Sequence, residues 1–215
     1  TNRGTAATLT GSSLGDRLTG GFGNDIITGG AGTDIMNGGD GSDLYIIAAA
    51  TEHAAAEIAD TGASGKDEVR FTSALANATL TLFAGDTGIE QAVIGTGTAS
   101  AAVTTATTAL NINAAALSYG LALIGNAGAN TLTGGSGADR LQGGAGNDTL
   151  IGGAGSYHLL GGICSDTLTG GADVDWFIFD TAPNATTNMD TITDFVSGTD
   201  KLQFSKAVFT GLSSA

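Results

Sequence analysis

Large apolar residues recur every nine positions in two stretches of the chain. Each lies in the middle of a three-residue segment that is too short for a helix but long enough for a short strand. Two segments per 18 residues predict a coil with one strand on each side, and such coils would stack about 4.8 Å apart. The apolar residues would then form a thin ladder between two sheets, made of Leu18, Ile27, Met36 and Tyr45, then Leu132, Leu141, Leu150, Leu159, Leu168 and Phe177.

Glycine and aspartate occupy the turns between these strands. From Gly20 the chain reads GGFGNDIIT, GGAGTDIMN and GGDGSDLYI, after a weaker unit, GSSLGDRLT, from Gly11. From Gly125 it reads GNAGANTLT, GGSGADRLQ, GGAGNDTLI, GGAGSYHLL, GGICSDTLT and GGADVDWFI. The glycines permit positive φ, so the backbone can turn tightly and direct its carbonyls inward. The sixth-position Asp adds a carboxylate beside those carbonyls.

The segments outside the two arrays have their own patterning. Alternating apolar residues, as in Val69-Arg70-Phe71 and Leu80-Thr81-Leu82, predict strands that extend the solenoid or cap the second array. A short helix is expected over residues 48–59. The tail from Trp176 predicts aromatic strands that close the open end. The chain therefore divides into a first array (1–46), a β-rich spacer (47–124), a second array (125–179) and a C-terminal capping segment (180–215).

Composition narrows the choice of partners. Glycine supplies 36 of the 215 residues and proline only one, which excludes collagen and argues against a disordered Pro/Gly-rich chain. The net charge of −14 repels nucleic acid and anionic lipid, and leaves divalent cations as the natural counterions. The longest apolar stretch, Leu117 to Ile124, is too short to span a membrane.

The number of cysteines and the N-terminal residues give information on the cellular location of the protein. Cys164 is the only cysteine, so no internal disulfide can form; a secreted protein stabilised by metal is compatible with this. The chain begins Thr1-Asn2-Arg3-Gly4 without an apolar signal segment. We therefore expect an excised fragment, or export by a route that needs no N-terminal signal.

The unit G-G-x-G-x-D-x-U-x, with U a large apolar residue, resembles the RTX (repeats-in-toxin), or hemolysin-type, calcium-binding repeat. The resemblance covers about 90 residues directly. It implies an all-β fold, a parallel β-roll or β-solenoid, with Ca²⁺ between successive loops on the same side. It also implies type I secretion into calcium-rich surroundings, and hence an extracellular or cell-surface location.

The same resemblance implies the metal ligands. The earlier loop of each pair gives its Asp and the carbonyls at positions 2 and 4, and the later loop gives its Asp and the carbonyls at positions 1 and 3. One site of the first array is expected to use Asp25 and Asp43 with the carbonyls of Gly21, Gly23, Gly38 and Asp40. The other, less regular site is expected to use Asp16 and Asp34 with the carbonyls of Ser12, Leu14, Gly29 and Ala31.

In the second array one side stacks Asn130, Asp148 and Asp166. The Asp148/Asp166 site is expected to use the carbonyls of Gly144, Gly146, Gly161 and Ile163. The Asn130/Asp148 site, with Gly143 and Ala145 in its later loop, lacks one charge and should bind more weakly. The other side stacks Asp139, Tyr157 and Asp175, where Tyr157 removes a carboxylate; we expect its two sites to be empty or weak.

Four further residues depart from the repeat or lie beyond it. Cys164 and Asp173 replace fourth-position glycines, so strain or an altered loop is expected at both. In the tail, Asp190 and Asp194 either hold a terminal Ca²⁺ or are turn residues of a capping hairpin.

Calcium should also control folding, because without it the stacked loops bring carboxylates face to face over a thin core. No catalytic centre is expected. Gly11-Ser12-Ser13-Leu14-Gly15 matches G-x-S-x-G but lacks the strand and helix that a nucleophile elbow needs. His53 and His158 lack metal-ligand spacing and are expected at the surface.

The sequence thus predicts a calcium-binding structural module of a secreted or cell-surface bacterial protein. An adhesin, surface-layer or filament role is expected, with end-to-end assembly of copies through exposed strands. The alternative is the calcium-binding and secretion domain of an RTX enzyme, such as a serralysin-like protease, a lipase or an epimerase.

Overall fold

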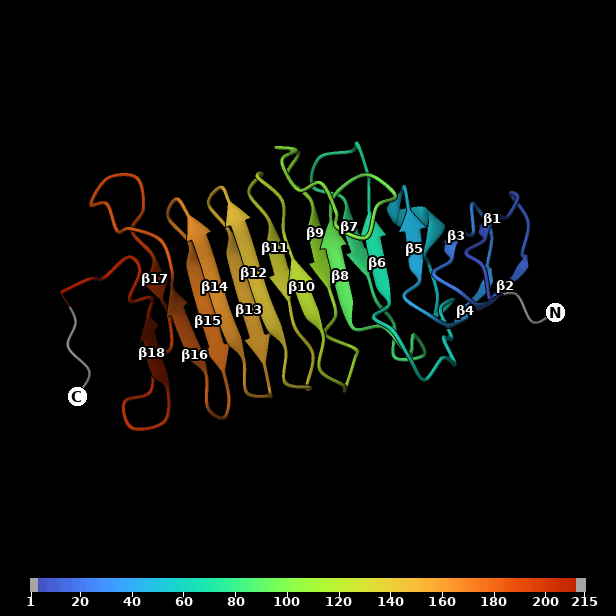
Figure 1. Cartoon of the computed structure of the whole chain (residues 1–215). Helices are drawn as coiled ribbons and strands as arrows, with labels where there is room; N and C mark the ends of the chain where they lie inside the picture. The colour runs from blue at the N-terminus through green and yellow to red at the C-terminus, as the bar shows by residue number, and fades with distance from the viewer. Residues whose placement is uncertain (1–3, 212–215) are drawn as a thin grey trace.

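The computed structural model describes residues 4–211 and consists almost entirely of short parallel strands wound into an elongated solenoid (Figure 1). One face is a ten-stranded parallel sheet, called sheet A, that runs the length of the molecule. Its strands, in spatial order, are β1 (Thr8–Thr10), β3 (Ile26–Thr28), β5 (Leu44–Ile47), β6 (Glu68–Phe71), β8 (Gln91–Ile94), β10 (Ala122–Ile124), β12 (Arg140–Ala145), β14 (His158–Ile163), β16 (Trp176–Phe179) and β18 (Lys201–Phe204).

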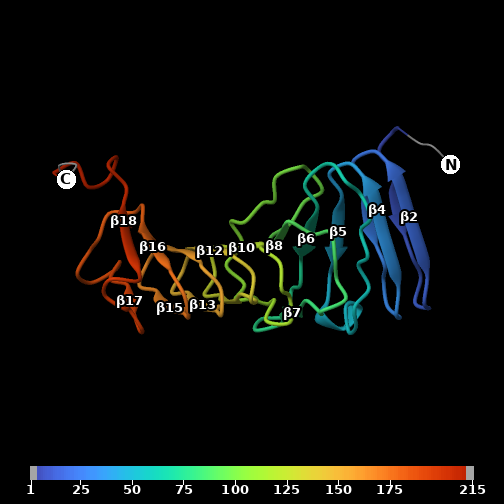
Figure 2. The same cartoon turned by 90° about the horizontal axis from the view of Figure 1, so that it is seen from below.

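The opposite face contains two smaller sheets, and Figure 2 shows the faces as opposed layers. Sheet B comprises β7 (Thr79–Thr81), β9 (Asn111–Asn113), β11 (Thr131–Thr133), β13 (Thr149–Gly153), β15 (Thr167–Gly171) and β17 (Thr191–Ile192). Nearer the N-terminal end, β2 (Arg17–Phe22) pairs with β4 (Ile35–Asp40). Isolated parallel bridges, Met36 to Ile58 and Ala59 to Thr87, continue this face into the spacer.

The strand register confirms the expected 18-residue coil within the arrays. Leu141 pairs with Leu159 in sheet A, and Leu132 pairs with Leu150 in sheet B. The side chains between the sheets form one continuous buried cluster. It includes every residue of the predicted ladder except Leu18, which is only partly buried. The all-β parallel β-roll predicted from the sequence is therefore confirmed.

The spacer continues the solenoid without the nine-residue unit. In sheet A, Tyr45 of β5 pairs with Val69, Val69 pairs with Ala92, and Ala92 pairs with Leu123. These steps are longer than 18 residues because loops of variable length bulge out between the strands. The helix expected over residues 48–59 is wrong: this segment contains only the 3₁₀ turn η1 (Ala50–Glu52). The division of the chain at residues 46, 124 and 179 stays a prediction.

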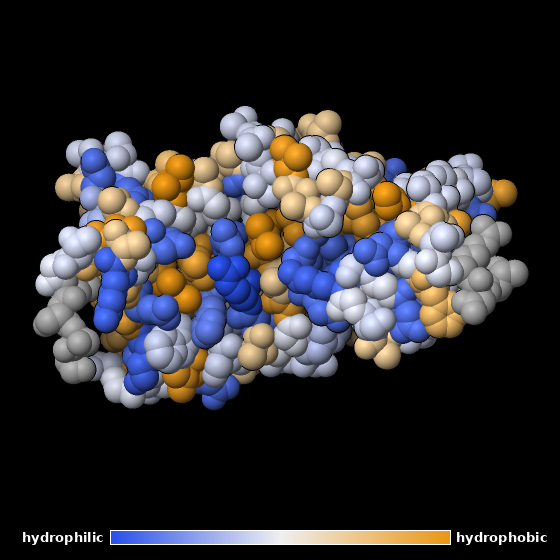
Figure 3. Space-filling model, in the orientation of Figure 1, coloured by the Kyte–Doolittle hydropathy of each residue, from blue (hydrophilic) through white to orange (hydrophobic). Residues whose placement is uncertain are grey.

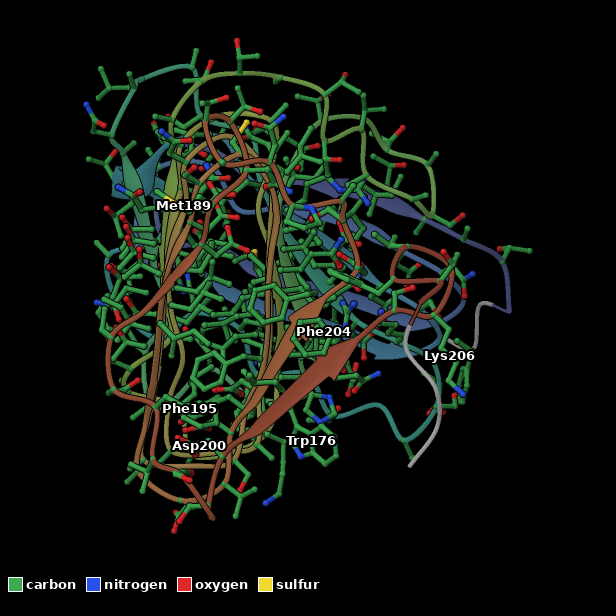
Figure 4. All side chains as sticks on the ribbon, turned by 90° about the vertical axis from the view of Figure 1, so that its left-hand side faces the viewer. Trp176, Met189, Phe195, Asp200, Phe204 and Lys206 are labelled. Carbon is green, nitrogen blue, oxygen red and sulfur yellow. The ribbon has the colours of Figure 1, made fainter. Side chains whose placement is uncertain are left out.

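The tail adds one further coil. β17 pairs with β15, and β18 pairs with β16. Phe204 of β18 stacks on Phe179, with ring centroids 5.3 Å apart, and meets Phe209 edge-on. The four residues of β18 are exposed, so this end of sheet A presents an open edge among the described residues (Figure 4).

The remaining surface is mixed in polarity. Figure 3 shows hydrophilic residues beside scattered apolar ones on the face of sheet A, without one broad apolar area. Between residues 4 and 211 no helix is long and apolar enough to cross a membrane.

Candidate metal sites

The sixth residue of each nonapeptide lies directly before a strand, so these residues line up along the solenoid. We call the line beside sheet A row A; its array members are Asp25, Asp43, Asp139, Tyr157 and Asp175. The line on the opposite face is row B, with array members Asp16, Asp34, Asn130, Asp148 and Asp166. The structure thus brings together, one coil apart, the residues that the sequence pairs.

Hydrogen bonds from backbone N–H groups to carboxylates link successive residues of each row. The N–H of one row residue donates to the carboxylate Oδ1 of the residue one coil later. The distances are 2.7 Å from Asp25 to Asp43 and 2.8 Å from Asp148 to Asp166. The N–H of Asp16 bonds to Asp34 in the same way at 2.9 Å. One oxygen of such a carboxylate is therefore fixed by the preceding coil, which leaves the other for a ligand.

That second oxygen, Oδ2, is buried and has no hydrogen-bond partner at six of the row residues. Burying a carboxylate oxygen without a partner is expensive, and native structures rarely leave such an atom unsatisfied. The repetition of the same unpaired atom coil after coil indicates that a cation is its partner. The six residues are Asp25, Asp34, Asp43, Asp148, Asp166 and Asp175.

Backbone carbonyls converge on the same points. A Cβ added to Gly20 would collide with Asp25 Oδ2 and lie 2.6 Å from the Gly38 carbonyl oxygen. A Cβ on Gly143 would likewise meet Asp148 Oδ2 and lie 2.6 Å from the Gly161 carbonyl oxygen. The first glycine of the unit therefore leaves room where a carboxylate and a later-loop carbonyl meet.

The structure also places the other predicted donors in these turns. Beside Gly11, Asp16 Oδ2 and the Gly29 carbonyl approach each other, and beside Gly125 Asn130 Oδ1 and the Gly143 carbonyl do so. The strand ends of β2, β4, β12 and β14 contain Gly21, Asp40, Gly144, Ala145 and Ile163. The loops contain Ser12, Leu14, Gly23, Ala31 and Gly146. Their metal ligation stays a prediction.

Burial makes these carboxylates hard to ionise without a cation. Desolvation raises the pKa of Asp148 to about 8 and the pKa of Asp166 to about 7. It also raises the pKa of Asp43 and of Asp175 to about 6. Asp16, which is only partly buried, differs: hydrogen bonds from the Ser12 backbone and hydroxyl lower its pKa. The buried row residues thus combine burial with negative charge.

The pKa shifts predict an inverted pH dependence for the calcium-depleted protein. These carboxyls have folded pKa values above their unfolded value of about 4, so their protonation stabilises the fold at low pH. That stability should be lost as the pH rises through about 6 to 8, where the folded carboxyls ionise. Far-ultraviolet circular dichroism in calcium-depleted buffer should show more β structure at about pH 5 than at about pH 8. A β signal that grows with pH would contradict this assignment.

The donor set fits one kind of metal. Carboxylate and carbonyl oxygens are the ligands of a hard cation, and every donor that the repeat predicts is an oxygen. Six oxygens around each expected position match the coordination number of Ca²⁺. Fold and donors together define a calcium-binding parallel β-roll.

The comparison with known families agrees. Residues 10–45 and 124–159 match the model of the RTX calcium-binding nonapeptide repeat, in four copies. The chain therefore carries RTX calcium-binding repeats, and their ion is Ca²⁺. No curated protein and no solved structure matches the chain.

Two row positions replace the carboxylate, with different consequences. The Tyr157 phenol is fully buried and fills the turn: its hydroxyl donates to the Gly135 carbonyl at 2.5 Å and accepts from the Gly155 N–H at 3.0 Å. Gly135 O is one of the carbonyls that a metal there would use. The Asn130 amide has a partner within the protein, because its Nδ2 donates to the Leu110 carbonyl at 2.8 Å. Asp139, beside Tyr157, has both oxygens occupied by backbone N–H groups.

The strain expected at the two replaced glycines is confirmed. Cys164 has φ of 86° and Asp173 has φ of 70°, in the left-handed region that favours glycine.

Sequence reasoning missed row members in the spacer. Asp67 accepts the Asp43 N–H at 2.7 Å, and Glu90 accepts the Asp67 N–H at 2.7 Å, so row A continues beyond the first array. The signal was present in Gly65-Lys66-Asp67 and Gly88-Ile89-Glu90, which keep the fourth-position glycine and the sixth-position acid.

The tail also lengthens both rows. Asp190 accepts the Asp166 N–H at 3.1 Å in row B, and Asp200 accepts the Asp175 N–H at 3.2 Å in row A. Asp194 instead accepts the N–H groups of Gly170 and Gly171. A terminal Ca²⁺ on Asp190 stays a prediction.

Glu57 and Asp86 continue row B into the spacer, because they directly precede Ile58 and Thr87, which form the parallel bridges of this face. A histidine, His53, lies beside both of them. Glu57 donates its N–H to Asp86 Oδ1 at 3.0 Å, and His53 bridges the two side chains, 3.3 Å from Glu57 and 2.8 Å from Asp86. All three side chains are buried, so the expectation that His53 is a surface residue is wrong; His158 is exposed. Burial alone would lower the pKa of His53, but the hydrogen bonds and charges of Asp86 and Glu57 raise it.

The G-x-S-x-G segment lies in the turn between β1 and β2, and the next element is the strand β2 rather than a helix. Ser12, which precedes the motif serine Ser13, donates its hydroxyl to Asp16 Oδ2 at 2.8 Å and accepts from the Leu14 N–H.

Proposed function

We propose that this chain is a structural calcium-binding module of a secreted or cell-surface bacterial protein, and that it folds on binding Ca²⁺ outside the cell. The observation that carries the proposal is the repeated buried Oδ2 without a partner, present in both arrays. The RTX repeat match supports the choice of ion. Export by a type I system is part of the proposal, since the module would stay unfolded in low calcium and fold on release.

The energetics are consistent with calcium as a folding switch. A site at tenfold saturation adds about 1.4 kcal/mol to the free energy of unfolding. Extracellular calcium modules have dissociation constants of about 10⁻⁴ to 10⁻³ M, so millimolar calcium saturates them only in part. Several such sites still amount to a large share of a total stability of about 5–15 kcal/mol. The apolar ladder contributes only one large side chain per strand, so the fold needs the stability that calcium adds.

The test is a calcium titration of the chelated protein followed by circular dichroism. We expect little β signal in chelator and a cooperative gain as Ca²⁺ is added, with Mg²⁺ at equal concentration far less effective. An unchanged β signal in chelator would show that folding does not depend on calcium.

We further propose a scaffolding role without catalysis, as in an adhesin, a surface layer or a filament. The exposed edge of β18, with Leu202 and Phe204, and the opposite end at β1 offer strand edges on which copies could add end to end. Light scattering during the same titration should show assembly beginning only after the β signal has formed. Purely monomeric folded protein at high concentration would rule out this mode of assembly.

A further inference from the structure

The turn at residues 60–67 of the spacer packs directly on the last turn of the first array. The Ala63 N–H donates to Asp40 Oδ1 at 3.0 Å, and the Gly41 N–H donates to the Ser64 carbonyl at 3.1 Å. A Cβ on Gly62 would collide with the Gly39 carbonyl oxygen, so the two backbones are in close contact there. The spacer side of this junction lies outside the residues that match the RTX repeat, which end at residue 45 in the first array.

Three carboxylates meet at the junction. Asp43, Asp60 and Asp67 each offer an oxygen within 4.8 Å of the other two. Their side chains come from three points in the chain and are buried, with residue exposures of 1%, 6% and 5%. None of the ion pairs formed within residues 4–211 involves any of the three.

The hydrogen bonds around the cluster leave an oxygen for a ligand. Asp43 Oδ1 accepts the Asp25 N–H, and Asp67 Oδ1 accepts the Asp43 N–H. The Tyr45 hydroxyl donates to Asp60 Oδ2 at 2.5 Å, and the Gly62 N–H donates to Asp60 Oδ1 at 2.9 Å. Asp43 Oδ2 has no partner at all, although it is completely buried. An unpaired carboxylate oxygen beside two further carboxylates favours a bound cation.

We propose that Asp43, Asp60 and Asp67 bind a further Ca²⁺, at a site completed by Asp60, a residue outside the nonapeptide pattern. The inference rests on the proposed function, because it assumes a calcium-dependent roll. Three carboxylates are ligands of a hard cation, and the calcium-binding repeats on the same row favour Ca²⁺. Asp60 distinguishes this site from the array sites: it stands outside row A, is held by Tyr45, and adds a third carboxylate.

The electrostatics of the cluster agree with this assignment. Burial, with the charge of Asp60 as a smaller contribution, raises the pKa of Asp43 to about 6 and the pKa of Asp67 to about 7. A bound Ca²⁺ would relieve this repulsion and join the first array to the spacer, so that calcium stabilises the junction as well as the arrays.

Counting bound ions by native mass spectrometry in calcium tests the site. Asp60→Asn keeps the shape and an acceptor for Tyr45, and is expected to bind one Ca²⁺ fewer than the wild-type protein. Asp180→Asn, an exposed acid outside both rows, makes the same charge change and is the matched control with an unchanged count. If Asp60→Asn keeps the wild-type count, the inference is wrong. If the wild-type protein binds no Ca²⁺, the proposed function fails instead.

A second variant tests the site independently, in case Asp60→Asn does not fold. Terbium(III), which replaces Ca²⁺, luminesces when excited through a nearby tyrosine, and Tyr45 touches Asp60. Tyr45→Phe should keep the number of bound ions while losing the part of the tyrosine-excited emission that comes from this site. Emission equal to the wild-type level at equal terbium occupancy would overturn the proposal.

Discussion

Asp148→Asn is expected to stabilise the protein in chelator and to destabilise it in excess calcium. In chelator the substitution removes a buried carboxylate whose Oδ2 has no partner. The new amide could donate to the Gly161 carbonyl, which lies beside that oxygen next to Gly143. Satisfying a buried polar group in this way is worth about 1–3 kcal/mol.

In calcium the sign reverses because the site loses a charged ligand. At calcium concentrations of about 100 times the dissociation constant, each site that the variant loses lowers the free energy of unfolding by about 2.7 kcal/mol. Asp148 is an expected ligand of two sites, so a total of about 5.4 kcal/mol outweighs the gain of about 1–3 kcal/mol in chelator. Asn130 is the chain's own precedent for an amide at a row position, since it accepts the Asn126 N–H at 2.8 Å and donates to Leu110. The amide therefore fits the turn, and the effect of the substitution should come from charge.

Urea unfolding of the wild-type protein and the variant, each with chelator and with excess calcium, measures both signs. Asp180→Asn, exposed and outside the rows, should shift neither midpoint measurably. A variant that is destabilised to the same degree in both conditions would mean that Asp148 acts through packing rather than through calcium.

Most of the fold follows from the period of the apolar residues. A nine-residue repeat with one large side chain per three-residue strand leaves few ways to bury Leu141 or Leu150 other than stacking on their neighbours one coil away. The strands of the spacer were harder to predict, because its loops vary in length and interrupt the nine-residue period. Val69 and Ala92 still occupy ladder positions, since the register is set by strand pairing rather than by loop length.

The candidate sites, like the fold, could be predicted only in part from the sequence. The pairing of Asp25 with Asp43 followed from the resemblance to the RTX repeat, and the weakness expected around Tyr157 followed from the carboxylate missing there. The sequence could not show that the Tyr157 hydroxyl binds the Gly135 carbonyl in place of an ion. Nor could it show that Asp60 joins Asp43, because a contact between two loops of unequal length depends on how they pack.

The same limit explains His53. A lone histidine in an alanine-rich segment reads as a surface residue, yet here it lies between two row B acids. In this part of the spacer a histidine side chain contacts both carboxylates, although Glu57 Oε1 stays without a partner. The pKa of His53 is raised by Asp86 and Glu57, so a positive charge at this point is favoured whether or not calcium is present.

His53→Gln is therefore expected to destabilise the protein by about 3–5 kcal/mol, the range for removing one partner of a buried ion pair. Unlike Asp148→Asn, it should destabilise to a similar extent in chelator, wherever folded protein persists, and in excess calcium. His158→Gln makes the same substitution at an exposed histidine of β14 and should change the free energy of unfolding by less than about 0.5 kcal/mol.

The pH dependence of the His53→Gln effect identifies the charge as its cause. The folded pKa of His53 is raised, so its contribution is fully present below the ordinary histidine pKa of about 6.5 and is lost as the pH rises through the folded value. The difference in unfolding free energy between the wild-type protein and the variant, measured in calcium, should therefore shrink at alkaline pH. A constant difference would assign His53 a packing role against Phe83, whose ring centroid lies 5.6 Å from its own. A difference that shrinks places a protonated histidine in row B, where it neutralises Glu57 and Asp86 as Ca²⁺ is proposed to neutralise the carboxylates of the arrays.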